Sequence, residues 1–566
     1  MPGTWFLQLA LFIVILVVVA LPLGEYMAQV FEGKRNILSF ALVPVEKCLY
    51  KLFGIDPFKE MNWKTFALNL LIFNLVGIVA LFTLQEVQQW LPLNPQNLGA
   101  VRWDTALNTA ISYVTNTNWQ AYNSETTMSY LTQMLGMSLQ NFLSAASGIA
   151  VAVALIHGFA RKSAFQLGNF WAILTRAILY ILLPLAIIFS LILVSQGTVQ
   201  NFHNYVHVHT LQGQEQIIAQ GPAASQIAIK HLGTNGGGFF GANSAHPYEN
   251  PTPLTDYLEI YGLLIISAAF PFAFGAMLNN RRQGVAIFVT MLLLFLSILA
   301  FAIWAEFHGS PLLEKIGIHH GINMEGKEMR FGPLSSTVFA VSTTAASTGA
   351  VNSLHTSFLP LSGLTLIFNM AIGGVIFGGV GAGLVGMLFY AILTMFLIGL
   401  MIGRTPEIYG KKLEPYEMIM AVIAILGPAI MQLILGAIAI TNFSDSTYLS
   451  DSGSHGISTV LYAYASTLVN NGSAFGGLNS NTIFYNITTS IAMLAGRCLT
   501  LIPAIAIAGS LAQKKPTPFS SRFPTASPMF VVILAIMIII IGALTYMPVY
   551  VLGPILEHCS MLFGKN

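Results

Sequence analysis

The run LGTNGGGFFGANS, residues 232–244, contains the polar tripeptide Thr234-Asn235-Gly236. Three similar tripeptides occur elsewhere in the chain: Asn116-Thr117-Asn118, Ser347-Thr348-Gly349 and Asn470-Asn471-Gly472. Their last residues lie 118, 113 and 123 positions apart, and long apolar segments flank each of them. Four similar loops in one chain can surround a single axis, and their backbone carbonyls can replace the water shell of a cation. The pattern therefore predicts a cation-selective membrane protein.

The composition excludes most soluble classes. Of the 566 residues, 55% are hydrophobic and only 8% are charged, whereas a soluble chain carries about 25% charged residues. The formal net charge of +2 is too small to indicate binding to nucleic acid. The three cysteines, Cys48, Cys498 and Cys559, are far apart and show neither metal-ligand spacing nor a disulfide framework.

Apolar runs of about 20 residues predict membrane-spanning helices. We expect ten, near 4–24, 64–87, 129–158, 170–195, 253–278, 284–306, 358–403, 416–441, 482–511 and 526–549. The first is interpreted as a retained helix, because no Lys or Arg precedes it as in a secretory signal. Five alternate connecting segments carry 16 of the 24 Lys and Arg residues. Since cationic loops stay in the cytoplasm, both termini are predicted to lie outside.

The expected fold is an all-α polytopic membrane protein with four pseudo-repeated helix–pore loop–helix units around a central filter. One extra helix stands at each end of the chain. The predicted divisions are a first transmembrane helix at 1–30, pore units at 64–160, 168–280, 283–405 and 415–512, and a last transmembrane helix at 525–550. Short segments near 104–115, 222–233, 335–346 and 458–469 are expected to enter as half-helices. Their carboxyl ends, which are partly negative, would face a cation.

The loops offer neutral oxygen ligands. Glycine permits left-handed backbone and close approach at three of the four loop ends, and Asn118 takes that place in the first loop. A single loop of this kind is more often an ordinary turn between helices, but four in matched context favour a site. None of the loops contains the carboxylates that Ca²⁺ or Mg²⁺ would require. A monovalent ion fits, although these residues alone do not separate K⁺ from Na⁺.

Two polar residues flank the predicted filter. Gln120 follows the first loop, and either hydrogen bonding behind the filter or direct contact with the ion would explain it. Arg497 falls within a predicted span, where a charge usually faces a cavity or a partner. A role below the filter is preferred there over a purely structural arginine.

The seventh apolar segment is crowded with glycine. Gly378, Gly379, Gly381 and Gly383 lie near its centre, and such density should break a helix. A gate beneath the third loop and close helix packing are both open interpretations. Although 381–386 matches G-x-G-x-x-G, no strand precedes it and no acidic partner follows, so a dinucleotide site is excluded. The chain also lacks a phosphate-binding G-x-x-x-x-G-K-[ST] run and an Asp-Lys-Thr-Gly phosphorylation sequence, and we expect it to bind no nucleotide.

The chain resembles the potassium-binding KdpA family of the bacterial Kdp-type potassium-transporting ATPases, along essentially its whole length. The resemblance depends on the four loops with their neighbours, at 114–120, 232–244, 347–352 and 469–477. It implies a fold similar to the Trk, Ktr and HKT potassium transporters, with the four loops as an outward-facing K⁺ selectivity filter. It also implies roles in ion handling for Gln120, Gly236 and Arg497, and a glycine-rich break that blocks direct leak.

The resemblance further implies a complex in the bacterial inner membrane. The partners would be the P-type ATPase KdpB, which hydrolyses ATP, together with KdpC and the small protein KdpF, and membrane lipid would surround them. The ion would pass through an intramembrane tunnel to KdpB, so that this chain is no enzyme by itself. The alternative is a stand-alone Trk- or Ktr-like K⁺ channel or symporter. A polytopic membrane enzyme is disfavoured, because no His, Cys or carboxylate cluster stands at membrane depth.

Overall fold

The computed structural model describes residues 3–309, 322–443, 446–515 and 523–563. Within these residues, ten helices or runs of helix are long and apolar enough to cross a membrane, as the sequence predicts. They are α1 (Gly3–Phe31), α3 (Trp63–Glu86), η2–α6 (Thr132–Ser138, Leu139–Ala160), α7–η3–α8 (Phe170–Arg176, Ala177–Leu182, Leu183–Ser195), α10 (Pro253–Met277), α11 (Arg281–Phe307), α15 (Ala382–Met401), α16 (Pro415–Asn442), α18 (Ile483–Gln513) and α19–η7–α20 (Pro528–Tyr550, Val551–Ile555, Leu556–Phe563).

The first helix is longer than expected. The apolar run predicts a helix near 4–24, but α1 continues past Gly24 to Phe31. A Cβ at Gly24 would lie 2.5 Å from the carbonyl oxygen of Ala269 in α10. The glycine therefore allows close contact between two helices instead of ending one.

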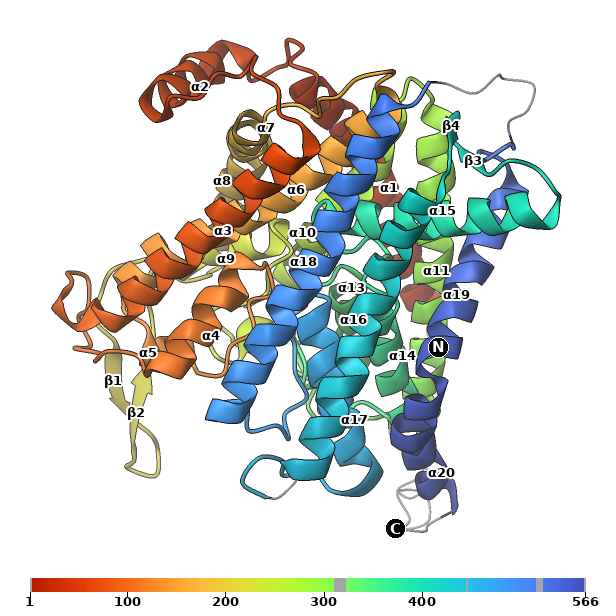
Figure 1. Ribbon diagram of the computed structural model, residues 1–566. Coiled ribbons are helices and arrows are strands. Elements are labelled where there is room, and N and C mark those ends of the chain that lie inside the picture. Colours follow the sequence, from red (N-terminus) through yellow and green to blue (C-terminus); the bar gives the residue numbers. More distant parts are fainter. Residues whose placement is uncertain (1–2, 310–321, 444–445, 516–522, 564–566) are drawn as a thin grey trace.

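One helix was not predicted. Helix α2 (Ser39–Phe53) lies in the charged connection between the first two spans, and Figure 1 shows it projecting from one end of the bundle. Its side chains Phe40, Leu52 and Phe53 are exposed although apolar, a composition typical of a helix at a membrane interface. The 15-residue length is too short to span, so a search for long apolar runs misses it.

The remaining elements are short. Antiparallel pairs are formed by β1 (Val206–His209) with β2 (Glu215–Ile218) and by β3 (Glu407–Ile408) with β4 (Lys411–Lys412). Helical turns are α5 (Ser124–Thr127), η1 (Gln88–Trp90), η4 (Asn243–Ala245) and η5 (His355–Ser357).

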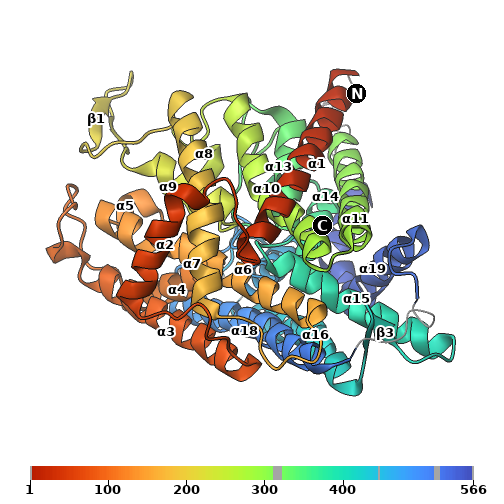
Figure 2. The ribbon, with the colours of Figure 1, turned by 90° about the horizontal axis from the view of Figure 1, so that it is seen from above.

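Four short helices lie inside the bundle, close to the four predicted segments. They are α4 (Trp103–Val114), α9 (Ala223–Leu232), α13 (Gly332–Ala345) and α17 (Gly453–Leu468). Each contacts the long helix before it and the helix after it: α4 lies between α3 and α6, α9 between α8 and α10, α13 between α11 and α14, and α17 between α16 and α18. Figure 2 shows α6 and α10 inside the bundle, and α3 and α19 at its edge. The short helices are therefore enclosed by protein, which a non-spanning segment at membrane depth requires.

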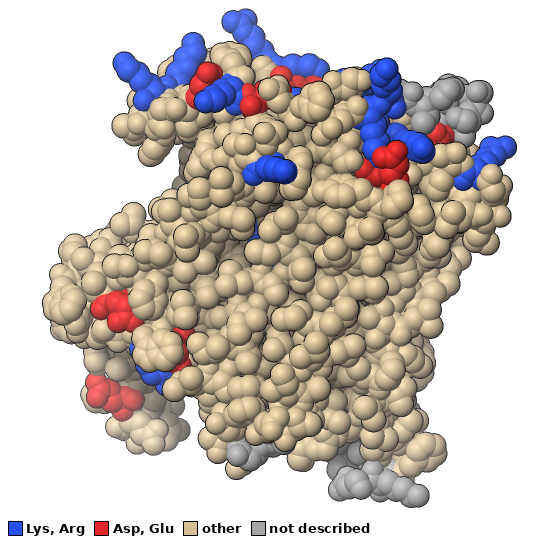
Figure 3. Space-filling model, viewed as in Figure 1, with Lys and Arg blue, Asp and Glu red and all other residues tan. Residues whose placement is uncertain are grey.

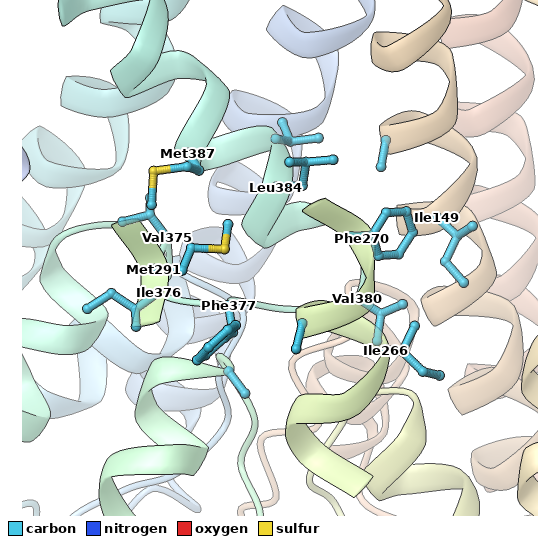
Figure 4. Close-up of a cluster of buried hydrophobic side chains, with 14 of the residues drawn as sticks. Ile149, Ile266, Phe270, Met291, Val375, Ile376, Phe377, Val380, Leu384 and Met387 are labelled. Carbon is cyan, nitrogen blue, oxygen red and sulfur yellow. The ribbon is translucent and has the colours of Figure 1, made fainter. Parts of the chain in front are cut away.

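The seventh apolar segment is broken, as predicted. Helix α14 (Pro360–Ala371) ends before the glycine-rich stretch 372–381, and α15 begins after it. Figure 4 shows apolar side chains around this break, among them Ile266 and Phe270 of α10, Met291 of α11 and Phe377 of the break itself. Only α15 is long enough to count as a span.

Charged residues are concentrated at the ends of the molecule. In Figure 3, Lys and Arg gather at the end that carries α2 and the β3–β4 pair, and the long middle zone is almost free of charge. This distribution is that of a multi-pass membrane protein, whose uncharged belt faces lipid.

Candidate functional site

Each of the four polar loops begins with the same backbone turn. The first loop residue has a left-handed φ, which is 66° at Asn116, 50° at Thr234, 50° at Ser347 and 57° at Asn470. The N–H of the next residue donates to the carbonyl five residues earlier, at N···O distances of 2.8–2.9 Å in all four loops. This is the Schellman ending of an α-helix, which satisfies the last helical carbonyls. The four short helices therefore end in the same way where the loops start.

Hydrogen bonds connect each loop to the next. Asn116 Nδ2 donates to the Thr234 carbonyl (3.0 Å), and the Gly349 N–H donates to the Asn235 carbonyl (3.0 Å). Ser347 Oγ donates to the carbonyl of Val469, which precedes the fourth loop (2.6 Å), and Asn470 Nδ2 donates to Thr117 Oγ1 (2.9 Å). The contacts run from the first loop to the fourth and back to the first. Four segments more than 100 residues apart thus form one closed ring.

Glycine is required where two loops touch. At Gly236, where φ is 122°, a Cβ would lie 2.2 Å from the Gly349 nitrogen. At Gly472 it would lie 2.0 Å from the Thr117 carbonyl oxygen. In the first loop, Asn118 adopts a φ of 56°, so asparagine takes a positive φ as Gly236 and Gly472 do, whereas Gly349 does not adopt the left-handed backbone expected of it. Side chains larger than hydrogen cannot enter between these backbones without moving a loop.

The ring is polar and buried. The side chains of Thr117, Asn235, Thr348 and Asn471 have no exposed surface. The carboxyl ends of α4, α9, α13 and α17 all lie at the ring, and each carries a partial negative charge. No group of three or more His, Cys, Asp or Glu that could hold a metal occurs in the described part of the chain. The arrangement offers neutral oxygens and helix dipoles, which suit a monovalent cation.

Gln120 lies behind the second loop. Its Oε1 accepts from the Gly238 N–H (3.1 Å), and its Nε2 donates to the Gly238 carbonyl (3.2 Å) and to Ser124 Oγ (2.6 Å). Both ends of the amide are therefore engaged with protein, which supports the hydrogen-bonding interpretation of this residue.

A cavity lies between the ring and the glycine-rich stretch 372–381, on the side that we call beneath the ring. It has a volume of about 60 Å³, and its lining includes Asn116, Ser347, Asn470, Arg497 and the 373–375 stretch. The Arg497 side chain is almost fully buried and donates from Nη2 to the Ser144 carbonyl and to Ser147 Oγ, each at 2.9 Å. Its Nε has no hydrogen-bond partner among the described residues. A positive charge thus stands beside the space that the first, third and fourth loops share.

The glycine-rich break is attached to the underside of the ring. The Val380 N–H donates to Thr234 Oγ1 (2.9 Å), and the Gly378 N–H donates to the Ala345 carbonyl (3.0 Å). A Cβ at Gly383 would lie 1.6 Å from the Phe377 carbonyl, and one at Gly381 would lie 2.5 Å from the Gly148 carbonyl. Gly379 has more room, with its nearest neighbour at 3.6 Å. Three of the four glycines, Gly378 included, are thus fixed by close backbone contacts.

Sequence reasoning missed a set of residues that hold the loops from behind. They stand four positions before each first loop residue and are Ser112, Lys230, Thr343 and Ser466. Ser112 and Thr343 donate hydroxyl hydrogen bonds to carbonyls of their own loop segments, and Ser466 accepts one from the Gly472 N–H. The constant spacing was the available signal. An Asn-Ser pair begins seven residues after Gly236 and again seven residues after Gly472, but the two asparagines bind differently. Asn243 Nδ2 donates to the Gly236 carbonyl, whereas Asn479 Nδ2 donates to the Thr447 carbonyl.

The chain is similar to known proteins along nearly its whole length. Residues 10–559 match the family described as "Potassium-transporting ATPase A subunit". Relatives named "Potassium-transporting ATPase potassium-binding subunit" include those of Herpetosiphon aurantiacus (52% identical; 98% of each chain covered) and Pseudomonas aeruginosa (51% identical; 97% of this chain and 98% of the relative). The crystal structure of the potassium transporter TrkH from Vibrio parahaemolyticus has a similar fold, with a TM-score of 0.53 at 15% identity, over 86% of this chain and 96% of that one. The chain therefore belongs to the family of potassium-transporting ATPase A subunits.

Proposed function

We propose that the ring of four loops is a K⁺ selectivity filter and that the chain is the potassium-binding subunit of an ATP-driven importer. The ring would bind one dehydrated K⁺ through carbonyl, hydroxyl and amide oxygens. The proposed ligands come from Asn116, Thr117, Asn118, Thr234, Asn235, Gly236, Ser347, Thr348, Gly349, Asn470, Asn471 and Gly472. The observation that carries the proposal is the closed series of hydrogen bonds between the loops.

The cavity and the break beneath the ring support a path that does not run straight to the cytoplasm. An ion leaving the filter would meet the Arg497 guanidinium and the stretch 372–381, which is bonded to the second and third units. We propose that this stretch, with Gly378, Gly379, Gly381 and Gly383, acts as a gate. The ion would then leave sideways through an intramembrane tunnel to the P-type ATPase KdpB.

The relatives' names, which describe the potassium-binding subunit of a potassium-transporting ATPase, support a complex with an ATPase subunit. We propose that KdpB binds and hydrolyses ATP, with KdpC, KdpF and membrane lipid completing the assembly in a bacterial inner membrane. The pore units at 64–160, 168–280, 283–405 and 415–512 would surround the ion. Both termini would lie outside, because the cationic end in Figure 3 would face the cytoplasm.

A replacement of Gly236 tests the filter directly. In the reconstituted complex, Gly236→Ala should raise the K⁺ concentration for half-maximal ATPase activity by about tenfold or more, because the new Cβ displaces the third loop. Gly236→Asp should in addition reduce discrimination against other cations, since it places a carboxylate in the ring. Gly99→Ala is the matched control, because Gly99 is exposed and has no atom within 4 Å of its Cβ position. Unchanged K⁺ dependence in both Gly236 variants would remove the second loop from the filter.

The likeness to TrkH favours one competing function, a stand-alone K⁺ channel or symporter. The two functions differ in what the chain does without partners. We expect the purified chain to copurify with an ATPase subunit and to conduct little K⁺ in liposomes that lack it. Rapid K⁺ flux through the chain alone would support the competing function.

A further inference from the structure

In each of the four short helices α4, α9, α13 and α17, one residue contacts the following loop twice, once through its backbone carbonyl and once through its side chain. The carbonyls of Ser112, Lys230, Thr343 and Ser466 accept the N–H of the second residue of their loops, at 2.8–2.9 Å. The side chains make the second contact. In three loops this contact is a direct hydroxyl hydrogen bond to the loop backbone, as at Ser112 Oγ with the Trp119 carbonyl (3.0 Å). In the second loop the residue is a lysine.

Lys230 reaches the loop through an intermediate. Its Nζ donates to Asn243 Oδ1 (2.6 Å), and Asn243 Nδ2 donates to the Gly236 carbonyl (2.8 Å). Nζ also forms an ion pair with Glu249, and neither side chain of the pair has exposed surface. Two consecutive hydrogen bonds thus connect the buried ammonium group of Lys230 to the Gly236 carbonyl.

Capping the helix does not require this charge, because neutral hydroxyls suffice in the other three loops. Burying an ion pair costs desolvation energy and is weak evidence of a gain in stability. A charged donor polarises the amide that it binds, and the polarised amide then donates more strongly. The Gly236 carbonyl therefore accepts from an amide that the ammonium group polarises, at the loop that touches Gly349.

We propose that Lys230 is a positioning residue that fixes the Gly236 carbonyl through Asn243 and so sets the ion affinity and selectivity of the second loop. The proposal depends on the proposed function of the ring as a K⁺ filter. The purely structural alternative is that the pair only attaches α9 to the segment that follows its loop. Glu249 also accepts from Ser244 Oγ (3.3 Å), which lies in that segment.

Two changes to the reconstituted complex separate these roles. The double variant Lys230→Ser/Glu249→Gln removes both charges and supplies the hydroxyl found at Ser112 and Ser466. Asn243→Ala leaves the ion pair in place and removes the amide that links Lys230 Nζ to the Gly236 carbonyl, at a position whose left-handed φ of 55° alanine also strains. The readouts are half-saturating K⁺, half-saturating Rb⁺ and the ATPase rate at saturating K⁺.

We expect both variants to raise the half-saturating K⁺ concentration by about tenfold. The ratio of the half-saturating Rb⁺ concentration to the half-saturating K⁺ concentration should move closer to one, and the ATPase rate at saturating K⁺ should change less. The matched control is Lys327→Ser/Glu306→Gln, since that ion pair is also fully buried and its side chains bind Asn323, Glu325 and Leu359, none of which belongs to the four loops. It should lower thermal stability without changing the K⁺ to Rb⁺ ratio. If the double variant does not assemble, Asn243→Ala decides the result alone.

Unchanged half-saturating K⁺ and Rb⁺ in assembled Asn243→Ala would overturn the inference. If Gly236→Ala still lowers K⁺ affinity in the same preparation, the filter survives and only the role of Lys230 fails. If Gly236→Ala also has no effect, the second loop is not part of the filter, and the proposed function on which the inference depends fails at this loop.

Discussion

At the residue scale, Arg497 is the charge that we propose acts on the moving ion. Its guanidinium lines the cavity below the ring and is held by two hydrogen bonds to α6. Arg497→Met should reduce K⁺ transport by about tenfold or more, because it removes the fixed charge from the ion path. Methionine fills a similar volume, so the amount of folded complex and its melting temperature should change much less.

The control is Arg497→Lys, which keeps a positive charge and should retain more transport than Arg497→Met. Transport should be measured as ⁸⁶Rb⁺ or K⁺ uptake, and folding as the yield of monodisperse complex. Loss of expression in the methionine variant, with normal transport in whatever folds, would make Arg497 a structural residue.

At the element scale, the break between α14 and α15 should not tolerate a methyl group added at Gly383, where the start of α15 packs against it. A Cβ at Gly383 would lie 1.6 Å from the Phe377 carbonyl, so Gly383→Ala forces the break or α15 to move. We expect a loss of about 1–3 kcal/mol in stability, together with altered K⁺ transport. Gly363→Ala within α14 is the control, because its nearest neighbour lies at 3.8 Å. Equal melting temperatures and transport for the two variants would contradict the close contacts of the break.

The C-terminal helix α20 is tied to α17 by a titratable pair. Glu557 Oε1 lies 2.9 Å from His455 Nδ1. The other ring nitrogen, His455 Nε2, lies 3.6 Å from Asp451 Oδ2 and 2.8 Å from Thr356 Oγ1. The hydrogen bond with Glu557, followed by the charges of Glu557 and Asp451, raises the pKa of His455 above 6.5, although burial opposes this. The contacts of His455 therefore stabilise the folded protein fully at a pH below the pKa of His455 in the unfolded chain. This stabilisation is lost as the pH rises through the higher pKa of His455 in the folded protein.

The melting temperature of the wild type should exceed that of His455→Gln most at about pH 6, and the difference should fall towards about pH 9. His209→Gln, at an exposed position in β1, controls for loss of a histidine. A difference that stays constant over this range would mean that the pair is held without the imidazolium charge.

At the scale of the whole molecule, the charge distribution predicts which end faces the cytoplasm. Cys48 lies exposed on α2, at the end rich in Lys and Arg. In a Cys498→Ser/Cys559→Ser background, an impermeant thiol reagent should label Cys48 in inside-out vesicles and not in intact cells. Cys48→Ser/Leu211→Cys in the same background should give the opposite result, because Leu211 is fully exposed between β1 and β2. Labelling of Cys48 from outside would reverse the predicted topology.

Composition and spacing along the chain were enough to predict the ten spans and the broken seventh segment, and the family was predicted from the resemblance of the four loops and their neighbours. Hydropathy depends on local composition, and a run of about 20 apolar residues has few other stable outcomes in a membrane. This reasoning failed where length was no guide, as at α2, and where a glycine served packing, as at Gly24. The positions of the four loops were predictable because polar residues with glycine or asparagine stand out between apolar runs.

How those loops meet depends on the folded arrangement of the helices. The hydrogen bonds that close the ring join residues such as Asn470 and Thr117, which are 353 positions apart. The contact of Gln120 with Gly238 and the relay from Lys230 to Gly236 also depend on which helices lie side by side. No local pattern carries that information, because a lysine in a short helix has the same composition whether it faces water or a buried glutamate. Its role becomes visible only when burial removes water as a competing partner.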